Sequence, residues 1–303
     1  MVQLGMRKPG VDPPSEPDWS MHVRGSVATR TYSWDNERNF AVSLTRAFGG
    51  ALLFSLPMLM TKEMWELGVY MDRLRLALLL LMMIPLLVGL AYYLGFESCT
   101  TLRDAILDAF VAIAVAAALA SVVLSIFGEL STDLTPREWI GKISLQSIAG
   151  SIGALLAQSQ FGHPASEDEK RREGGDFAEY FFMAAGALFL SANVAPTEEV
   201  VLIAHKMTPW HALVLVAFSI VLMHAFVYAV DFRGQHARAE HISLASEFIR
   251  FTIVGYLLAI LISAFLCWCF GRFDGHSAGE VLRISLVLGF PASLGAAAAR
   301  LIL

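Results

Sequence analysis

The sequence predicts an all-α fold, a polytopic transmembrane helix bundle of about eight spans that is arranged as two parallel four-helix repeats. Three observations lead to this prediction: low charge, long apolar blocks and internal self-similarity. Of the 303 residues, 56% are hydrophobic and only 16% are charged, whereas a soluble protein of this size needs more charge to cover its surface. The apolar blocks are about 20 residues long, the length that a helix needs to cross a bilayer. They do not alternate in polarity, which favours helices over barrel strands.

Eight segments are apolar and long enough to be spans. We expect them at 40–60, 75–95, 104–127, 142–160, 178–204, 209–231, 248–270 and 283–302, with ends accurate to a few residues. The fourth segment is the most polar, because it contains Ser144, Gln146, Ser147, Ser151 and Gln158. A hydropathy scan would readily miss this segment, so the count of eight depends on it.

The chain divides into four regions. Residues 1–38 contain four prolines among mixed charges and are predicted to be a polar, irregular cytoplasmic tail. Residues 39–161 form the first four-span repeat, and residues 178–303 form the second. Residues 162–177 carry the longest charge run and are predicted to be a cytoplasmic linker. Because the N-terminus is polar, we expect no cleavable signal and predict that the first span directs insertion.

The positions of the basic residues predict the orientation. Of the 22 Lys and Arg residues, 14 lie on the side of the tail, the linker and the C-terminus, and 8 lie on the opposite side. Basic residues are enriched in short cytoplasmic loops of membrane proteins. We therefore expect both termini in the cytoplasm, with the protein in a bacterial inner membrane.

Composition and cysteine usage argue against several other classes of protein. The net charge is −5 and no basic tract occurs, so we expect no binding to nucleic acid. The three cysteines, Cys99, Cys267 and Cys269, are odd in number, and the last two lie in an apolar run without neighbouring His or Cys ligands. We therefore expect no disulfide framework, no metal site and no cofactor, and we read these cysteines as packing residues.

The two halves of the sequence resemble each other when the chain is shifted by 136 positions. The matched pairs are Gly50 and Gly186, Ser55 and Ser191, Thr61 and Thr197, Glu63 and Glu199, and Tyr92 and Tyr228. The third spans end in SIFG and WCFG, and the fourth begin with KISL and RISL. Since each repeat has an even number of spans, both copies enter the membrane from the same side, which predicts a pseudo-two-fold axis along the membrane normal.

Polar residues interrupt spans one and five at equivalent positions. Pro196 removes a helix hydrogen bond, and the residues that follow it are typical of the first turn of a new helix, so we expect a break near 193–196. Many transporters build ion sites at such breaks, and oxygen ligands suit hard cations. The predicted substrate or ion path consists of Thr61, Glu63, Asn193, Thr197, Glu198 and Glu199, with Ser55, Ser191, Pro57 and Pro196 in support.

The depth of these glutamates has more than one interpretation. If span five runs straight from residue 178, Glu198 lies about 30 Å along the helix, at the outer surface of the membrane. Alternatively, the helix break holds the pair in a buried or water-filled cavity, where ionisable groups serve a function because their burial is costly. A catalytic role is a third reading. Even at the surface, acidic residues from two repeats would concentrate cations.

The segments FGGALLFSLPMLMTKEMW (48–65) and NVAPTEE (193–199) resemble an uncharacterised bacterial family of multi-span inner-membrane proteins. The resemblance covers spans one to eight and leaves out the N-terminal tail. It implies a helical membrane protein that is encoded beside a small partner protein, and it implies no activity. The family is usually described as spanning seven times. Our count of eight differs from this description at the polar fourth span.

The sequence leaves three functions open, of which a channel or secondary transporter for a cation or proton leads. One rival is a non-transporting sensor or scaffold that acts with a small partner in the bilayer. Another is an intramembrane protease of the prenyl-protein-processing type, which pairs adjacent glutamates with downstream histidines. Its motif fits poorly, because Ile203 stands where that family has Arg and Ile220 stands where it has Phe, before His224. We therefore expect no enzymatic activity.

Overall fold

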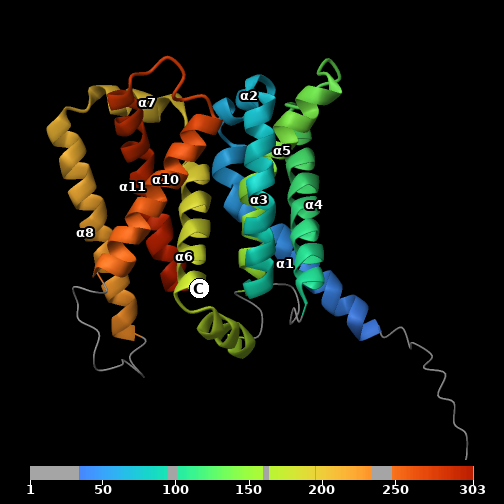
Figure 1. Cartoon of the computed structure of the whole chain (residues 1–303). Coiled ribbons are helices and arrows are strands. Elements are labelled where there is room, and N and C mark those ends of the chain that lie inside the picture. Colours follow the sequence, from blue (N-terminus) through green and yellow to red (C-terminus); the bar gives the residue numbers. More distant parts are fainter. Residues whose placement is uncertain (1–33, 95–100, 160–163, 195, 234–247, 303) are drawn as a thin grey trace, which may run out of the picture.

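The computed structural model describes residues 34–94, 101–159, 164–194, 196–233 and 248–302. These residues form ten α-helices and one short π-helix, and they contain no strand. The helices are α1 (Trp34–Leu59), α2 (Lys62–Tyr70), α3 (Arg73–Leu94), α4 (Leu102–Ile126), α5 (Pro136–Ser159), α6 (Pro164–Val194), α7 (Glu198–Lys206), α8 (Pro209–Arg233), η1 (Phe248–Ile253), α10 (Val254–Cys269) and α11 (Ala278–Ile302). The prediction of an all-α bundle is confirmed (Figure 1).

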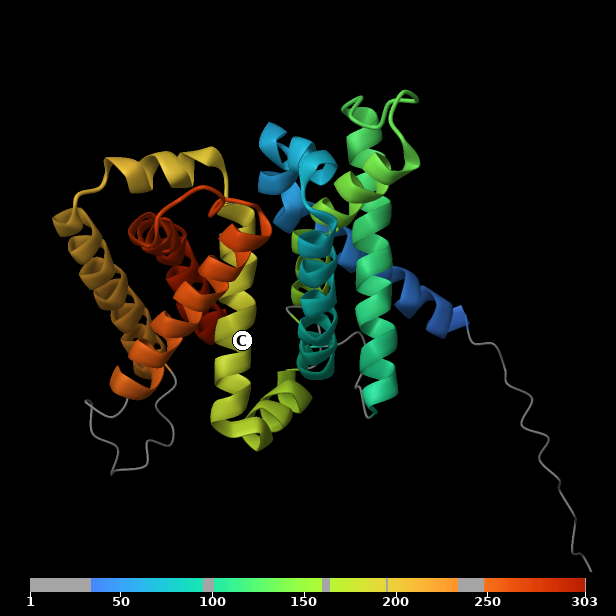
Figure 2. The same cartoon turned by 45° about the horizontal axis from the view of Figure 1, so that its top comes forward.

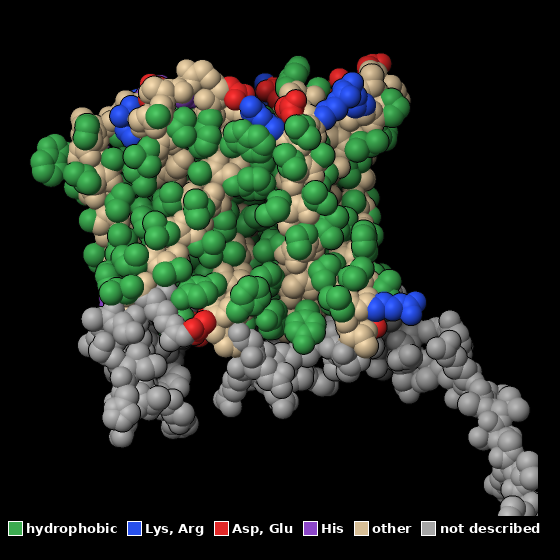
Figure 3. All heavy atoms as spheres, in the orientation of Figure 1, with side chains coloured by type: hydrophobic (Ala, Val, Ile, Leu, Met, Phe, Trp, Pro, Cys, Tyr) green, Lys and Arg blue, Asp and Glu red, His purple; other side chains and the backbone are tan. Residues whose placement is uncertain are grey.

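Eight of these helices are long and apolar enough to cross a membrane, as predicted. The polar fourth segment is one of them, and it is the most buried of the eight. Ser147, Ser151 and Gln146 are buried inside the bundle. The outer surface is a broad apolar band with charged side chains gathered towards its ends (Figure 3), which is the distribution that a bilayer requires.

Two short helices lie across one end of the bundle. Helix α2 follows α1, and α7 follows α6, and both have nine residues. Figures 1 and 2 show α7 running across the end of the second half, with α2 at the same end of the first half. The break that the sequence predicts near 193–196 lies between α6 and α7, and α1 ends in the same way before Thr61.

The same pairs of helices pack against each other in the two halves. Helix α1 crosses α5, and α6 crosses α11, each at two closely opposed glycines. A Cβ added to Gly50 would collide with the backbone of Gly153, and one added to Gly186 would collide with that of Gly295. Small residues allow such close helix approach in membranes. The repeat alignment relates Gly50 to Gly186, whereas the offset between KISL and RISL places Gly153 one residue away from Gly295. Superposition of the halves about a membrane-normal axis remains a prediction.

Aromatic side chains fill the seam between the two halves. Helix α6 of the second half contacts α1, α3 and α5 of the first. The ring of Phe54 meets that of Phe189 edge-on with centroids 5.1 Å apart, and Tyr93 lies 5.1 Å from Phe182. The first pair meets edge to face, and Phe182 is fully buried, whereas Phe54 is 36% exposed. Aromatic contacts therefore join α6 to α1 and α3 across the seam.

Both described ends of the chain lie towards the end of the bundle that is opposite α2 and α7 (Figure 1). Helix α1 begins at Trp34, so the last residues of the tail that we predicted to be irregular are helical; the rest of the tail lies outside the described residues. The charged linker is also helical from Pro164, and Gly175, with φ 52°, separates it from the membrane-spanning part of α6. Proline at the first helical position and charged helix formers after it favour this helix.

Candidate functional site

The two helix breaks leave backbone groups at the ends of α2 and α7 without partners from their own helices. Thr61 and Thr197 occupy the N-cap positions in extended conformations, and neither side chain caps its own helix. Thr61 instead donates its hydroxyl to the carbonyl of Pro57 at 2.6 Å. The first amides of α7 are therefore available to a partner from elsewhere in the chain.

Glu63 of the first half provides that partner. Its Oε2 atom accepts a hydrogen bond from the backbone amide of Glu198 at 3.1 Å, so a carboxylate of α2 caps the N-terminus of α7. An anion is favoured there because the helix dipole is positive at its N-terminus. The same Oε2 lies 3.2 Å from a guanidinium nitrogen of Arg272, in the loop between α10 and α11. Glu63 thus joins the two halves.

Arg272 occupies the centre of this arrangement. Its side chain is only 14% exposed, and its Nε donates to the carbonyl of Pro196 at 2.6 Å. A second guanidinium nitrogen lies 4.0 Å from a carboxylate oxygen of Glu198, whose side chain is 81% exposed. Pro196 therefore contributes in two ways: its ring ends α6, and its carbonyl, which the break leaves without a helical partner, holds Arg272.

These groups surround an open pocket of about 500 Å³ at this end of the seam. Its lining consists of Glu63, Glu198, Glu199, Val201, Leu202, His205, Gly271, Arg272 and His276. Its lining contains three carboxylates and one guanidinium, so carboxylates outnumber the permanent cation. Negative charge in a concave surface raises the local concentration of cations.

Glu199 is held in its charged form. The hydroxyl of Thr197 donates to its carboxylate and, together with the Glu199 backbone amide and the nearby charge of Arg272, keeps the pKa of Glu199 below its ordinary value. Glu199 is exposed, whereas Thr197 is buried. The pocket therefore presents a carboxylate rather than a neutral carboxylic acid at neutral pH.

The structure brings three of the six predicted path residues to the pocket, namely Glu63, Glu198 and Glu199. The other three are not in its lining. Thr61 donates to the carbonyl of Pro57, Thr197 donates to the Glu199 carboxylate, and Asn193 donates to the carbonyl of Phe189 within its own helix. The side-chain oxygen of Asn193 is buried without a hydrogen-bond partner. The participation of all six residues in one path remains a prediction.

The supporting residues act within their own helices. Buried Ser55 and Ser191 each donate to the carbonyl four residues earlier, that of Ala51 and of Ala187. These matching contacts occur one helix turn or more before the breaks. Pro57 lies inside α1 and is exposed. None of these three side chains lines the pocket.

Of the two main interpretations of depth, the structure agrees with the surface one. The carboxylates lie beyond the end of the span Gly175–Val194, at the end of the bundle where α2 and α7 lie. Trp65 lies in α2, Trp139 near the start of α5 and Trp210 near the start of α8. Tryptophan is enriched at the boundary between lipid and water, which agrees with a pocket near this boundary.

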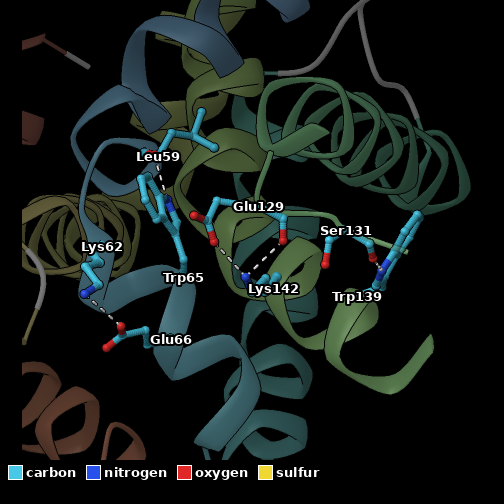
Figure 4. Close-up of polar contacts among 8 residues, drawn as sticks. All are labelled: Leu59, Lys62, Trp65, Glu66, Glu129, Ser131, Trp139 and Lys142. Atoms are coloured by element: carbon cyan, nitrogen blue, oxygen red, sulfur yellow. Dashed lines mark hydrogen bonds and ion pairs between the residues drawn. The ribbon is translucent and has the colours of Figure 1, made fainter. Parts of the chain in front are cut away.

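The same end of the first half contains a different charge pair (Figure 4). Lys142 of α5, with a side chain only 8% exposed, lies 2.8 Å from a carboxylate oxygen of Glu129 and donates to the Glu129 carbonyl at 3.0 Å. The indole of Trp65 donates to the carbonyl of Leu59 at the end of α1, and that of Trp139 donates to the carbonyl of Ser131. All these contacts stay within the first half.

Sequence reasoning missed Arg272, His205 and His276 as pocket residues. Arg272 directly follows Gly271, whose left-handed backbone (φ 72°) ends α10. The repeat alignment of SIFG with WCFG places Arg272 opposite Glu129. This difference in charge between the repeats is the sequence feature that could have pointed to Arg272. His205 and His276 lie too far apart in the sequence for any local pattern to relate them.

The other candidate histidine is not part of this pocket. His224 of α8 lies 3.2 Å from the hydroxyl of Thr252 and packs edge-on against Phe248. It contacts η1 and does not line the pocket with Glu198 and Glu199. The protease interpretation needs a histidine beside that glutamate pair, and His224 does not occupy that position.

Comparison with protein families gives one result. A family model described as "Putative integral membrane protein (DUF2391)" matches residues 43–303. The chain belongs to this family. No curated protein and no solved structure matches it. The match begins within α1 and includes both halves of the bundle, in agreement with the resemblance that spans one and five indicated.

Proposed function

We propose that this family member is a secondary transporter or channel for a cation or proton, and that the pocket at the seam is its entry vestibule. The observation that carries the proposal is the contact of Glu63 from one half with Arg272 and the α7 amide of the other, inside a pocket where carboxylates outnumber cations. A site built by both halves responds to any movement between them.

We further propose that the ring contacts Phe54–Phe189 and Tyr93–Phe182, which join the two halves, keep the path between them closed. This arrangement favours a transporter over an open channel. Ions would pass only if the halves move relative to each other, and rocking of one repeat against the other is the common mode of alternating access. In this mode, the contact between Glu63 and Arg272 would hold the two halves together at the end of the bundle where the pocket lies.

The test is ion flux in liposomes that contain the purified protein. Wild type is compared with Glu63→Gln, Glu199→Gln and the double variant over a panel of monovalent cations, divalent cations and protons. Glu66→Gln is the matched control, because Glu66 lies on the same helix but pairs with Lys62 and does not line the pocket. We expect flux of one cation in wild type and the control, and its loss in the double variant.

Two outcomes would count against the proposal. Wild-type flux that persists unchanged in the folded double variant would remove these carboxylates from the path. Complete absence of flux in wild type across the panel would favour the rival function, a non-enzymatic sensor or scaffold that acts with a small partner protein.

The proposal includes a location and an orientation. We place the protein in a bacterial inner membrane with both termini in the cytoplasm, so that the pocket faces the periplasm. The supporting observations are the excess of Lys and Arg on the terminal side and the position of both described ends opposite α2 and α7. A periplasmic signal from a reporter fused after Leu303 would contradict this orientation.

A further inference from the structure

Two histidines and a glutamate meet at the wall of the pocket, at a point distant from Glu63. They are His205 in the last turn of α7, His276 in the loop before α11, and Glu280 in the first turn of α11. One ligand atom from each, a ring nitrogen or a carboxylate oxygen, lies within 4.8 Å of the others. His205 Nε2 is 3.4 Å from Glu280 Oε1, and His276 Nδ1 is 3.8 Å from Glu280 Oε2.

The hydrogen bond of His205 to the backbone leaves its Nε2 atom directed at a carboxylate oxygen. Its Nδ1 atom lies 2.9 Å from the carbonyl oxygen of Val201. A carbonyl only accepts, so Nδ1 carries the hydrogen, and a neutral ring then has a lone pair on Nε2. That lone pair faces the carboxylate of Glu280. Two lone pairs at this distance repel each other unless a proton or a metal ion lies between them.

Ser277 and Glu280 form the capping box that begins α11, and its contacts orient the Glu280 carboxylate. Both the backbone amide and the hydroxyl of Ser277 donate to Glu280 Oε2 at 2.8 Å. Oε1 is therefore the oxygen directed at His205. Histidine held by a carbonyl and carboxylate held by a hydroxyl are the usual outer contacts of metal sites, because they fix the ligand atoms before the ion binds.

From this geometry we infer that His205, His276 and Glu280 bind a divalent transition-metal ion such as Zn²⁺. Two imidazole nitrogens and one carboxylate oxygen suit this class of ion. Around a tetrahedral ion the ligand atoms lie about 3.3 Å apart, as bonds of about 2.0 Å require, and here they lie within 4.8 Å of one another. A fourth ligand would come from water or a bound molecule, and both histidines line the pocket.

Binding would join three segments of the second half that are distant in sequence. Through His205 the ion would hold the C-terminal end of α7 to the loop before α11 and to α11 itself. The N-terminal end of α7 is already held by Glu63. Both ends of the helix that carries Glu198 and Glu199 would then be fixed. Metal binding at these three side chains would be present whether or not the protein transports an ion.

The test is metal binding by the tag-free full-length protein in detergent after treatment with a chelator. Zn²⁺ is titrated by calorimetry, and Co²⁺ is added separately to record its visible absorption. We expect one ion per chain, with binding weakened at least tenfold in His205→Ala and in His276→Ala. His211→Ala is the control, because His211 is an exposed histidine at the same end of the bundle whose ring contacts Thr208.

Glu280→Gln provides a third variant that keeps an acceptor for the Ser277 contacts. It is expected to weaken Zn²⁺ binding and to change the Co²⁺ spectrum. Absence of stoichiometric Zn²⁺ binding in wild type would overturn the inference and leave a proton as the only cation between His205 and Glu280. Equally tight binding in both folded histidine variants would also overturn it. Neither result bears on flux, so failure of this inference is distinct from failure of the transport proposal.

Discussion

The loops after α4 and α10 have similar backbone conformations but make different side-chain contacts. In each, a glycine in the left-handed conformation ends the helix, Gly128 with φ 77° and Gly271 with φ 72°. The next amide returns to the carbonyl five residues earlier, from Glu129 to Leu124 and from Arg272 to Cys267, at 2.8 Å in both cases. The side chain that follows the glycine is an anion in the first half and a cation in the second.

The charge of the side chain after the glycine determines which half of the protein each loop contacts. Glu129 binds buried Lys142 of its own half, so the first loop closes its repeat on itself. Arg272 binds Glu63 of the other half, so the second loop links the repeats. The comparison indicates that similar backbone in two repeats can serve stability in one and a shared site in the other, through a single side chain.

The largest expected effect of a substitution is in the first loop. Lys142→Met leaves the Glu129 carboxylate, which is 30% exposed, without its cation. Loss of one partner of this partly buried, charge-assisted contact costs about 2 kcal/mol of unfolding free energy. The measurement is unfolding in detergent, with Lys62→Met as control, because the exposed pair of Lys62 and Glu66 is worth about 0.5 kcal/mol or less.

A double-variant cycle sharpens this result. Lys142→Met combined with Glu129→Gln should lose less stability than the sum of the two single variants, since the second change removes the unpaired charge. If the two losses simply add, Lys142 and Glu129 do not act as a pair, and the contrast between the loops fails.

An intermediate effect is expected at the link between the halves. Glu63→Gln weakens a charge-assisted hydrogen bond to the first amide of α7, worth about 1.5 kcal/mol. Hydrogen exchange of the early α7 amides should therefore rise about tenfold, while the start of α2 stays protected. Glu66→Gln is the control on the same helix. Equal loss of protection in α2 and α7 would mean that Glu63 supports only its own half.

The smallest effect is expected at a second link between the halves. Both oxygens of Asp274 accept from Arg75 at 2.8 Å, and this contact holds the pKa of Asp274 below its ordinary value of 3.8. A lowered pKa means that the stabilisation is present above pH 3.8 and is lost as the pH falls through the folded-state value. Since Asp274 is 62% exposed, the pair contributes about 1 kcal/mol or less.

Unfolding measured at neutral and acidic pH tests this contribution. Asp274→Asn should lower the unfolding midpoint slightly at neutral pH and make no difference once Asp274 is protonated. Asp133→Asn, an exposed site in the loop of the first half, is the control. A larger effect of Asp133→Asn would show that the charges of the first loop matter more than this second link.

Local patterns were sufficient for the fold class and for part of the site. Blocks of about 20 apolar residues predict spans because a bilayer leaves the backbone no other means of satisfying its hydrogen bonds. Pro196 predicts the end of α6 for an equally local reason. The shared position of Glu63 and Glu199 pointed to this end of the bundle, where the structure has the pocket. The repeat alignment did not indicate that the side chain of Glu63, and not that of Glu199, contacts the other half.

By itself, the sequence determined that this protein is a helical membrane bundle with eight candidate spans and a helix break near 193–196, because span length and helix breaks depend on neighbouring residues. Only the tertiary structure decided that Arg272 meets Glu63, 209 residues away, and that His205 meets Glu280. Such contacts depend on how the helices cross and on where each loop turns, and no spacing along the chain encodes them.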